Sequence, residues 1–306
     1  MSEPGARAIS LRAHALRWYL RHRVKPRLAA AHTISRELVQ ASRRRLDDIA
    51  ARIPTPRGVQ VRPAPPGVRG EWLWPVRGAL SHGLYLHGGG FTVGSARLYR
   101  GLAGRLARAT GSAVLVPDYA LAPEQPFPAA LEDALAAWRS LVRAVGAEQR
   151  IWLAGDSAGG GLALSLAQHL CASGGKAPSA LALISPWTDL TASGDSVRDN
   201  ARRDHYLSAH LIAPVAQNYL QGHDPRDPRA SPLFGPMQAL PMLAVDVCES
   251  EILRDDGVRL VARVQAAGGV VRLRCHADLP HVFHAFAPLI PEAGRAIEDL
   301  AASLRS

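Results

Sequence analysis

The spacing of apolar positions along this chain changes in character after about residue 53. Before that point, apolar residues recur at helical spacing over residues 7–22 and 30–51, which predicts two amphipathic helices separated near Pro26. Five prolines between Pro54 and Pro66 then predict an extended, turn-rich stretch. The first fifth of the chain is therefore expected to be a helical segment distinct from the rest of the molecule.

Downstream, short apolar runs alternate with amphipathic stretches. Runs of strand length occupy residues 83–86, 113–117, 151–154, 180–184, 242–247 and 270–274. Helical patterns occupy residues 98–109, 129–145, 158–171, 257–267 and 292–304. Nearly continuous apolar strands separated by helices predict a mostly parallel sheet covered on both faces, that is, an α/β fold of about eight strands.

One region interrupts this alternation. From about residue 190 to 232 the chain lacks a central-strand pattern and carries one helical segment at residues 208–220. A segment of this kind leaves the sheet and returns to it, and with the N-terminal helices it is expected to cap the strand ends. We therefore divide the chain into an N-terminal helical cap segment (1–55), an α/β core (56–190 and 233–306) and an inserted cap segment (191–232).

The composition excludes several classes of protein. The 306 residues contain no apolar run long enough to span a membrane and no secretory h-region, so a cytoplasmic protein without stable membrane insertion is expected. Three widely spaced cysteines without a Cys-x-x-Cys pattern indicate reduced thiols.

The net charge of +10 is concentrated near the N-terminus. Residues 1–60 carry 13 Lys/Arg and 4 Asp/Glu, a balance of +9, which leaves 23 against 22 for the other residues. No nucleic-acid-reading module accompanies this charge, so no nucleic-acid partner is expected. Two interpretations remain open: contact with anionic lipid headgroups, or a solvated helix face. The excess of arginine over lysine throughout the chain favours the second.

Two short glycine-containing strings carry the chemistry. Gly-Asp-Ser-Ala-Gly at 155–159 follows a predicted strand and opens a predicted helix, which is the context of a nucleophile elbow with Ser157 as the nucleophile. His-Gly-Gly-Gly at 87–90 also follows a strand, and three consecutive glycines are costly in backbone entropy unless they serve a purpose. The amides of Gly88, Gly89 and Ala158 are the expected donors to an oxyanion. A phosphate-binding loop is excluded, because neither Gly-x-Gly-x-x-Gly nor Gly-Lys-Ser/Thr is present.

These strings and four others resemble the hormone-sensitive-lipase group (family IV) of bacterial carboxylesterases and lipases, within the α/β-hydrolases. The others are Asp-Tyr-Ala-Leu-Ala-Pro-Glu at 118–124, Ser-Pro-Trp-Thr-Asp at 185–189, Glu-Ile-Leu-Arg-Asp at 251–255 and His-Val-Phe at 281–283. The order and spacing match the family from about residue 80 to the C-terminus. The resemblance implies hydrolysis of short- to medium-chain acyl esters without a cofactor, a helical cap, and pairing of two copies through the last strand and helix.

Ser, then acid, then His is the order of the catalytic triad in such proteins. His281 is the expected base, because it follows the last predicted strand and matches the family string, while His284 is the alternative. Glu251 is the expected acid, since it follows the strand at 242–247, and Asp255 is the alternative. Four residues are expected to support the site: His87, Gly90, Tyr119 and Asp156. The resemblance implies that His87 braces the loop at 87–90, called the glycine loop below, through a hydrogen bond.

The sequence thus predicts a serine carboxylesterase. Alternatives on the same triad are an amidase, a lactonase or a xenobiotic deacetylase. An alternative of another class is a ligand-binding protein on an inactive hydrolase scaffold. No metal site is expected, because no His-Glu-x-x-His string and no cysteine pair are present.

Overall fold

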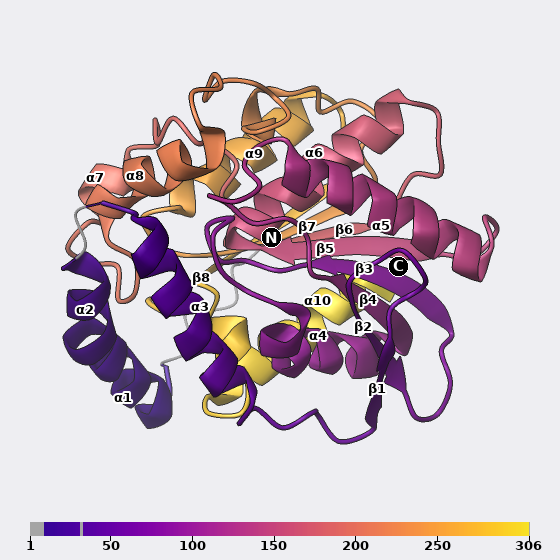
Figure 1. Cartoon of the computed structure of the whole chain (residues 1–306), viewed down its shortest axis with the longest axis horizontal. Helices are drawn as coiled ribbons and strands as arrows, with labels where there is room; N and C mark the ends of the chain where they lie inside the picture. The colour runs from indigo at the N-terminus through magenta and orange to yellow at the C-terminus, as the bar shows by residue number, and fades with distance from the viewer. Residues whose placement is uncertain (1–8, 31–32, 306) are drawn as a thin grey trace, which may run out of the picture.

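The computed structural model describes residues 9–30 and 33–305. They form one eight-stranded sheet with helices around it (Figure 1). The strand order is β1-β2-β4-β3-β5-β6-β7-β8; β2 runs antiparallel to both neighbours, and all pairs from β4 to β8 are parallel. The strands are β1 Val59–Pro63, β2 Gly70–Pro75, β3 Ser81–Leu86, β4 Ser112–Pro117, β5 Ile151–Asp156, β6 Leu181–Ile184, β7 Leu243–Cys248 and β8 Val271–His276. The predicted α/β fold is confirmed.

The central strands are buried along their whole length because helices cover both faces of the sheet. Every residue of β4, β5, β6 and β7 is buried, whereas the edge strands β1 and β8 contain only one buried residue, Val59. Successive residues of a strand point to opposite faces, so Leu153 joins the core on one side and Trp152 the core on the other.

Helices α5 (Ala129–Val145), α6 (Ser157–Ala172) and α9 (Arg254–Ala266) pack on the first of these faces (Figure 1). Helices α4 (Ala96–Thr110) and α10 (Pro291–Arg305) pack on the second. This two-layer cover explains why the apolar runs of the sequence locate the inner strands to within one or two residues.

The N-terminal helices differ from the prediction at Pro26. Helix α1 (Leu11–Tyr19) passes through a π-helical turn, Leu20–Val24, directly into α2 (Lys25–Ala29), in which Pro26 is the second residue. The predicted break at Pro26 is therefore wrong, because the π-helical turn before Pro26 shifts the hydrogen-bond pattern where proline has no N–H to donate. Residues 7 and 8, where the first helix was expected to begin, lie outside the described residues. Helix α3 occupies Arg36–Ala50.

The segment from 190 to 232 contains no strand of the sheet. It carries α7 (Ser196–Asp199) and α8 (Ala209–Leu220), which lie at the same end of the sheet as α1, α2 and α3 (Figure 1). The two parts of this cap are bonded to one another: Lys25 Nζ donates to the carbonyl oxygens of Ala201 at 2.9 Å and Asp204 at 2.8 Å. Within the described part of the chain, no helix is long and apolar enough to cross a membrane.

Candidate active site

Ser157 lies on a turn that only glycine can flank. It is the first residue of α6, directly after β5, and its φ of +51° lies in the left-handed region that non-glycine residues rarely adopt. A Cβ on Gly155 would lie 2.3 Å from the carbonyl oxygen of Gly159, and one on Gly159 would lie 2.2 Å from that of Leu86. Both positions therefore require glycine, and the tight turn projects the serine hydroxyl beyond the strand end.

Three side chains distant in the sequence form one hydrogen-bonded chain. Ser157 Oγ lies 2.9 Å from His281 Nε2, and His281 Nδ1 lies 2.9 Å from Glu251 Oε2. His281 and Glu251 are only 4% and 1% exposed, so water does not compete for these bonds. The structure thus brings together the three residues predicted from the sequence.

The two partners perturb each other's ionisation. Burial alone lowers the pKa of His281, but the hydrogen bond and negative charge of Glu251 outweigh burial and raise it above 6.5. Burial alone raises the pKa of Glu251, but the bond and charge of His281 outweigh it and hold that pKa below its usual value. The pair therefore favours an ionised glutamate beside an imidazole of increased basicity.

The alternative acid and base lie elsewhere. Asp255 Oδ2 accepts from the backbone N–H of Ser196 at 2.8 Å, and its Oδ1 pairs with Arg254 at 2.8 Å. His284 Nε2 lies 3.0 Å from Asp246 Oδ2. Neither side chain belongs to the chain of bonds that reaches Ser157.

One residue that fixes Glu251 has no predicted role in the sequence analysis. Ser185 Oγ donates to Glu251 Oε1 at 2.7 Å, and the backbone N–H of Cys248 donates to the same oxygen at 2.9 Å. Ser185 directly follows β6 and begins the Ser-Pro-Trp-Thr-Asp string, so its position at the carboxyl end of a parallel strand is the signal that could have identified it.

The glycine loop differs from the prediction in one donor. The backbone N–H of Gly88 donates to Asp156 Oδ1 at 3.0 Å, so this amide is occupied inside the protein. The expectation that Gly88 donates to an oxyanion is therefore wrong. Among the described residues, no acceptor is found for the N–H groups of Gly89 and Gly90. Gly90, predicted only to support the site, thus offers the amide expected of Gly88.

Asp156 anchors the glycine loop through hydrogen bonds. Besides the Gly88 amide, it accepts the hydroxyls of Tyr85 at 2.8 Å and Tyr99 at 2.9 Å. Burial raises the pKa of Asp156 to about 6, and these three hydrogen bonds limit the rise. The loop is therefore tied to the residue immediately before Ser157, which fixes the distance between Ser157 and the free amides of Gly89 and Gly90.

His87 and Tyr119 complete the support of the loop. His87 Nδ1 lies 2.9 Å from the carbonyl oxygen of Gly88, and its ring stacks on that of Tyr119 with centroids 4.3 Å apart. The Tyr119 hydroxyl donates to the carbonyl oxygen of His87 at 2.6 Å. Burial lowers the pKa of His87, so the neutral ring is favoured at this position.

The cap also contacts the loop through an arginine that the sequence did not reveal. Arg43 of α3 donates to the carbonyl oxygens of Thr92 and Ala122, both at 2.8 Å, and pairs with Glu124 at 2.9 Å. The basic residues at 43–45 and 52 give no reason to select Arg43 from the sequence, because only the fold turns it towards these carbonyls.

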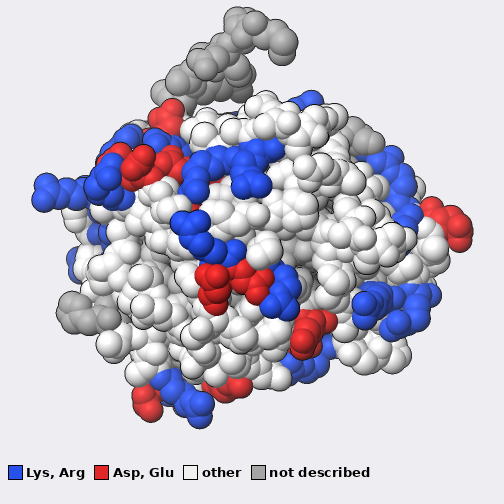
Figure 2. Space-filling view, turned by 90° about the horizontal axis from the view of Figure 1, so that it is seen from above, with Lys and Arg blue, Asp and Glu red and all other residues white. Residues whose placement is uncertain are grey.

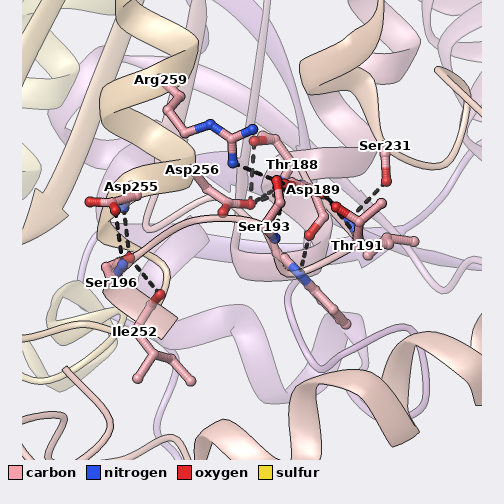
Figure 3. Close-up of polar contacts among 12 residues, drawn as sticks. Thr188, Asp189, Thr191, Ser193, Ser196, Ser231, Ile252, Asp255, Asp256 and Arg259 are labelled. Atoms are coloured by element: carbon pink, nitrogen blue, oxygen red, sulfur yellow. Dashed lines mark hydrogen bonds and ion pairs between the residues drawn. The ribbon is translucent and has the colours of Figure 1, made fainter. Parts of the chain in front are cut away.

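A second polar network joins the loop after β6 to the segment that follows Glu251 (Figure 3). Asp256 Oδ2 accepts the backbone N–H groups of Thr188 at 2.7 Å and Asp189 at 2.9 Å, and Arg259 pairs with Asp189 at 2.9 Å. These bonds join the loop after β6, which begins with Ser185, to the start of α9, which follows Glu251. The network positions the carboxylate without touching it.

Asp256→Asn is expected to stabilise the protein at high pH. Burial, assisted by the charge of Asp189, raises the pKa of Asp256 to about 7 from its ordinary 3.8. The folded protein therefore binds a proton that the unfolded chain releases, and this group's contribution to stability falls as pH rises from about 4 to about 7. Asparagine keeps an acceptor for both backbone N–H groups and cannot ionise.

The free energy of unfolding, from urea titrations, is expected to exceed that of the wild type by about 2 kcal/mol at pH 8. The gain should disappear near pH 4. An equal difference at both pH values would show that the charge of Asp256 is not its cause.

Among the described residues, one group has the spacing of metal ligands. Asp246, His276 and His284 offer ligand atoms within 4.8 Å of one another. Arg274 Nε also lies 2.7 Å from Asp246 Oδ1, and both histidines lie within hydrogen-bond distance of Oδ2. Arg274 thus already balances the charge of this carboxylate, and the group holds β7, β8 and the segment after His281 together.

Comparison with known proteins agrees with this geometry. A family model described as the alpha/beta hydrolase fold matches residues 83–285. An acetyl-hydrolase of Streptomyces hygroscopicus is 42% identical over 236 residues, 77% of this chain and 79% of that protein. An ethyl acetate hydrolase of Pseudomonas putida is 36% identical over 222 residues, 70% of this chain and 69% of that protein.

A solved structure described as an esterase from the bacterial hormone-sensitive lipase family superposes with a TM-score of 0.88 at 37% identity, over 97% of this chain and 98% of that one. The chain belongs to the α/β-hydrolase family and, within it, to the hormone-sensitive-lipase-like carboxylic ester hydrolases.

Proposed function

We propose that this esterase cleaves short- to medium-chain acyl esters through an acyl-enzyme on Ser157, with His281 as base and Glu251 as its orienting acid. The observation that carries the proposal is the unbroken chain of hydrogen bonds from Glu251 to Ser157, located beside amides that have no acceptor among the described residues. No residue of this mechanism requires a cofactor.

In the first half-reaction, Ser157 Oγ attacks the ester carbonyl carbon while His281 Nε2 accepts the hydroxyl proton. The carbonyl oxygen becomes an oxyanion, which the N–H groups of Gly89, Gly90 and Ala158 stabilise. The C–O bond to the alcohol then breaks, and the imidazolium returns the proton to the leaving oxygen. Glu251 keeps Nδ1 protonated and stabilises the cation during the step.

In the second half-reaction, water takes the place of the alcohol. His281 removes a proton from the water as its oxygen attacks the acyl carbon, and the same amides stabilise the second oxyanion. Collapse releases the carboxylic acid, and the proton on Nε2 returns to Ser157 Oγ. The enzyme is then restored, with one ester and one water converted to one acid and one alcohol.

The cap favours small acyl groups. Helix α8 lies close over the glycine loop: Phe91, which directly follows the loop, stacks on Tyr219 of α8 with ring centroids 3.8 Å apart. A Cβ on Gly90 would lie 2.8 Å from Cγ1 of Val215, another α8 residue. This close approach limits the space beside the free amides, and the names of the two relatives, an acetyl-hydrolase and an ethyl acetate hydrolase, agree with it.

A panel of p-nitrophenyl esters tests the proposal, run beside the matching anilides. The kcat/KM for acetate and butyrate is expected to exceed that for dodecanoate by roughly tenfold or more, because a long chain must displace the cap. The anilides should react more slowly than the esters. Faster anilide cleavage would favour an amidase, and failure to turn over any ester would remove the enzymatic assignment.

A further inference from the structure

The outward side of α1 is apolar, which is unusual for the exposed side of a helix. Leu11 is 87% exposed and Trp18 58% exposed, and Ala15 between them is also exposed. The spacing of four and then three residues puts these side chains in one row along the helix. We call this row the outer stripe; the opposite side of the helix contributes the buried Ala13 and Leu20.

Basic side chains flank the outer stripe without acidic neighbours in the sequence. The described residues 9–30 contain six Lys/Arg and no Asp/Glu; three of the six bond to other parts of the protein, namely Arg17, Arg21 and Lys25. Residues 61–306, in comparison, carry a balance of only +1, from 23 basic and 22 acidic residues. Arg12, Arg23 and Arg27 are exposed. On the face shown in Figure 2, by contrast, acidic and basic side chains lie beside one another.

The inner side of the same helix is fully engaged in the fold. The backbone N–H of Ser10 donates to Glu292 at 2.6 Å, Arg17 pairs with Asp278, and Leu20 is buried. The outer stripe therefore plays no part in holding α1 in place. A partner would meet a preformed surface and lose little ordering entropy on binding.

We propose that the outer stripe of α1 binds the surface of an anionic phospholipid bilayer. Leucine, tryptophan and the neighbouring Tyr19, which is 51% exposed, suit the boundary between headgroups and acyl chains, where one end of an aromatic ring is apolar and the other hydrated. The flanking arginines suit lipid phosphates, which they bind through paired N–H groups.

Two other occupants fit the surface less well. A second copy of this chain would bring its own basic segment against this one, with no acidic residue in 9–30 to compensate either charge. A nucleic acid would satisfy the arginines but leave Leu11 and Ala15 without apolar contact. An anionic lipid surface satisfies both parts.

The attachment of α1 to the segment before His281 would set the orientation of the bound enzyme. Arg17 pairs with Asp278, three residues before His281, so α1 is attached to the segment that carries the base. Binding through the outer stripe would thus hold the esterase with its cap end at the lipid, where apolar esters concentrate. This inference concerns location and goes beyond ester hydrolysis.

Co-sedimentation with vesicles tests the proposal on the full-length protein. Vesicles of three parts phosphatidylcholine to one part phosphatidylglycerol are expected to bind it, and phosphatidylcholine alone should bind it much less. Leu11→Ser and Trp18→Ser should each weaken binding roughly tenfold, by removing apolar burial. Arg12→Gln should weaken binding roughly fivefold, and a higher salt concentration should also weaken it.

Matched controls come from exposed residues elsewhere. Leu80, 89% exposed between β2 and β3, is the control for Leu11, and the exposed Arg77 is the control for Arg12. Leu80→Ser and Arg77→Gln should bind vesicles like the wild type, and all variants should hydrolyse soluble p-nitrophenyl acetate normally.

Three outcomes would overturn the proposal: no binding to anionic vesicles, equal weakening by the Leu80→Ser control, or a dimer in sedimentation velocity that Leu11→Ser dissociates. The last would identify a second copy as the occupant.

Discussion

Ser157→Ala is expected to lower kcat for p-nitrophenyl esters by roughly 10⁴- to 10⁶-fold. The variant keeps the amides that stabilise the oxyanion but has no hydroxyl to form the acyl-enzyme, so only the residual catalysis of the pocket remains. Initial rates with p-nitrophenyl acetate measure the loss. A fluorophosphonate probe, followed by mass spectrometry of the peptides, should label the wild type at Ser157 and leave the variant unlabelled.

Ser165→Ala is the matched control, because Ser165 lies in the same helix, α6, and donates its hydroxyl to the carbonyl oxygen of Arg229. Its kcat should stay within about twofold of the wild type, since changes remote from the reacting atoms alter stability more than chemistry. Full activity of the Ser157→Ala variant, or a label on another residue, would refute the proposed nucleophile.

Glu251→Gln is expected to lower kcat by about 10⁴-fold. Glutamine can occupy the same space and accept from Ser185, but it carries no charge to stabilise the imidazolium, and it does not dictate which nitrogen of His281 holds the proton. Asp255→Asn should leave kcat within about threefold, because that carboxyl group bonds to Ser196 and Arg254 and not to the base. Rates of the two variants decide between the two acids.

The pH profile of kcat/KM gives an independent measure of the same pair. His281 must be neutral to accept a proton, and Glu251 raises its pKa above 6.5, so the wild-type acid limb should lie above pH 6.5. Removing the negative charge should move that limb to lower pH in Glu251→Gln. If Asp255→Asn moves the limb and Glu251→Gln does not, the assignment of the acid is wrong.

The sequence predicted the inner strands well because their environment leaves a strong pattern. The chain at 151–154 is wholly apolar, and that at 242–247 is apolar except for Asp246, since helices bury both faces of these strands. The pattern did not locate β1 and β2, which lie among prolines and glycines. In the edge strand β1 only Val59 is buried, so no apolar alternation marks it. In β2 the apolar run of Trp72, Leu73 and Trp74 is short and ends at Pro75, which made it hard to distinguish from a turn-rich stretch.

The register of the glycine loop could not be read from the sequence either. Three consecutive glycines adopt almost any backbone conformation, so the string itself does not say which amides face the substrate. In the structure Gly89 has a φ of +125° and Gly90 of +60°, and Asp156 takes the amide of Gly88. A buried carboxylate 68 residues further along the chain therefore decides the question.

Four carboxylates between 249 and 256 posed a similar problem for the acid. Local spacing favoured Glu251, but the selection is made by the turn after β7, where Cys248 and Ser185 direct one oxygen and leave the other for His281. Such contacts join segments far apart in the chain, and no local pattern records them.

The ion pair between Arg17 and Asp278 has a practical consequence for engineering. The first helix of the cap cannot be exchanged for that of a relative as an independent module, because it forms an ion pair with the segment that carries His281. A chimera that widens the entrance would also disturb the imidazole unless the transplanted helix supplies an arginine at the place of Arg17. Libraries aimed at bulkier substrates are therefore better directed at α8, which borders the glycine loop through Val215 and Tyr219.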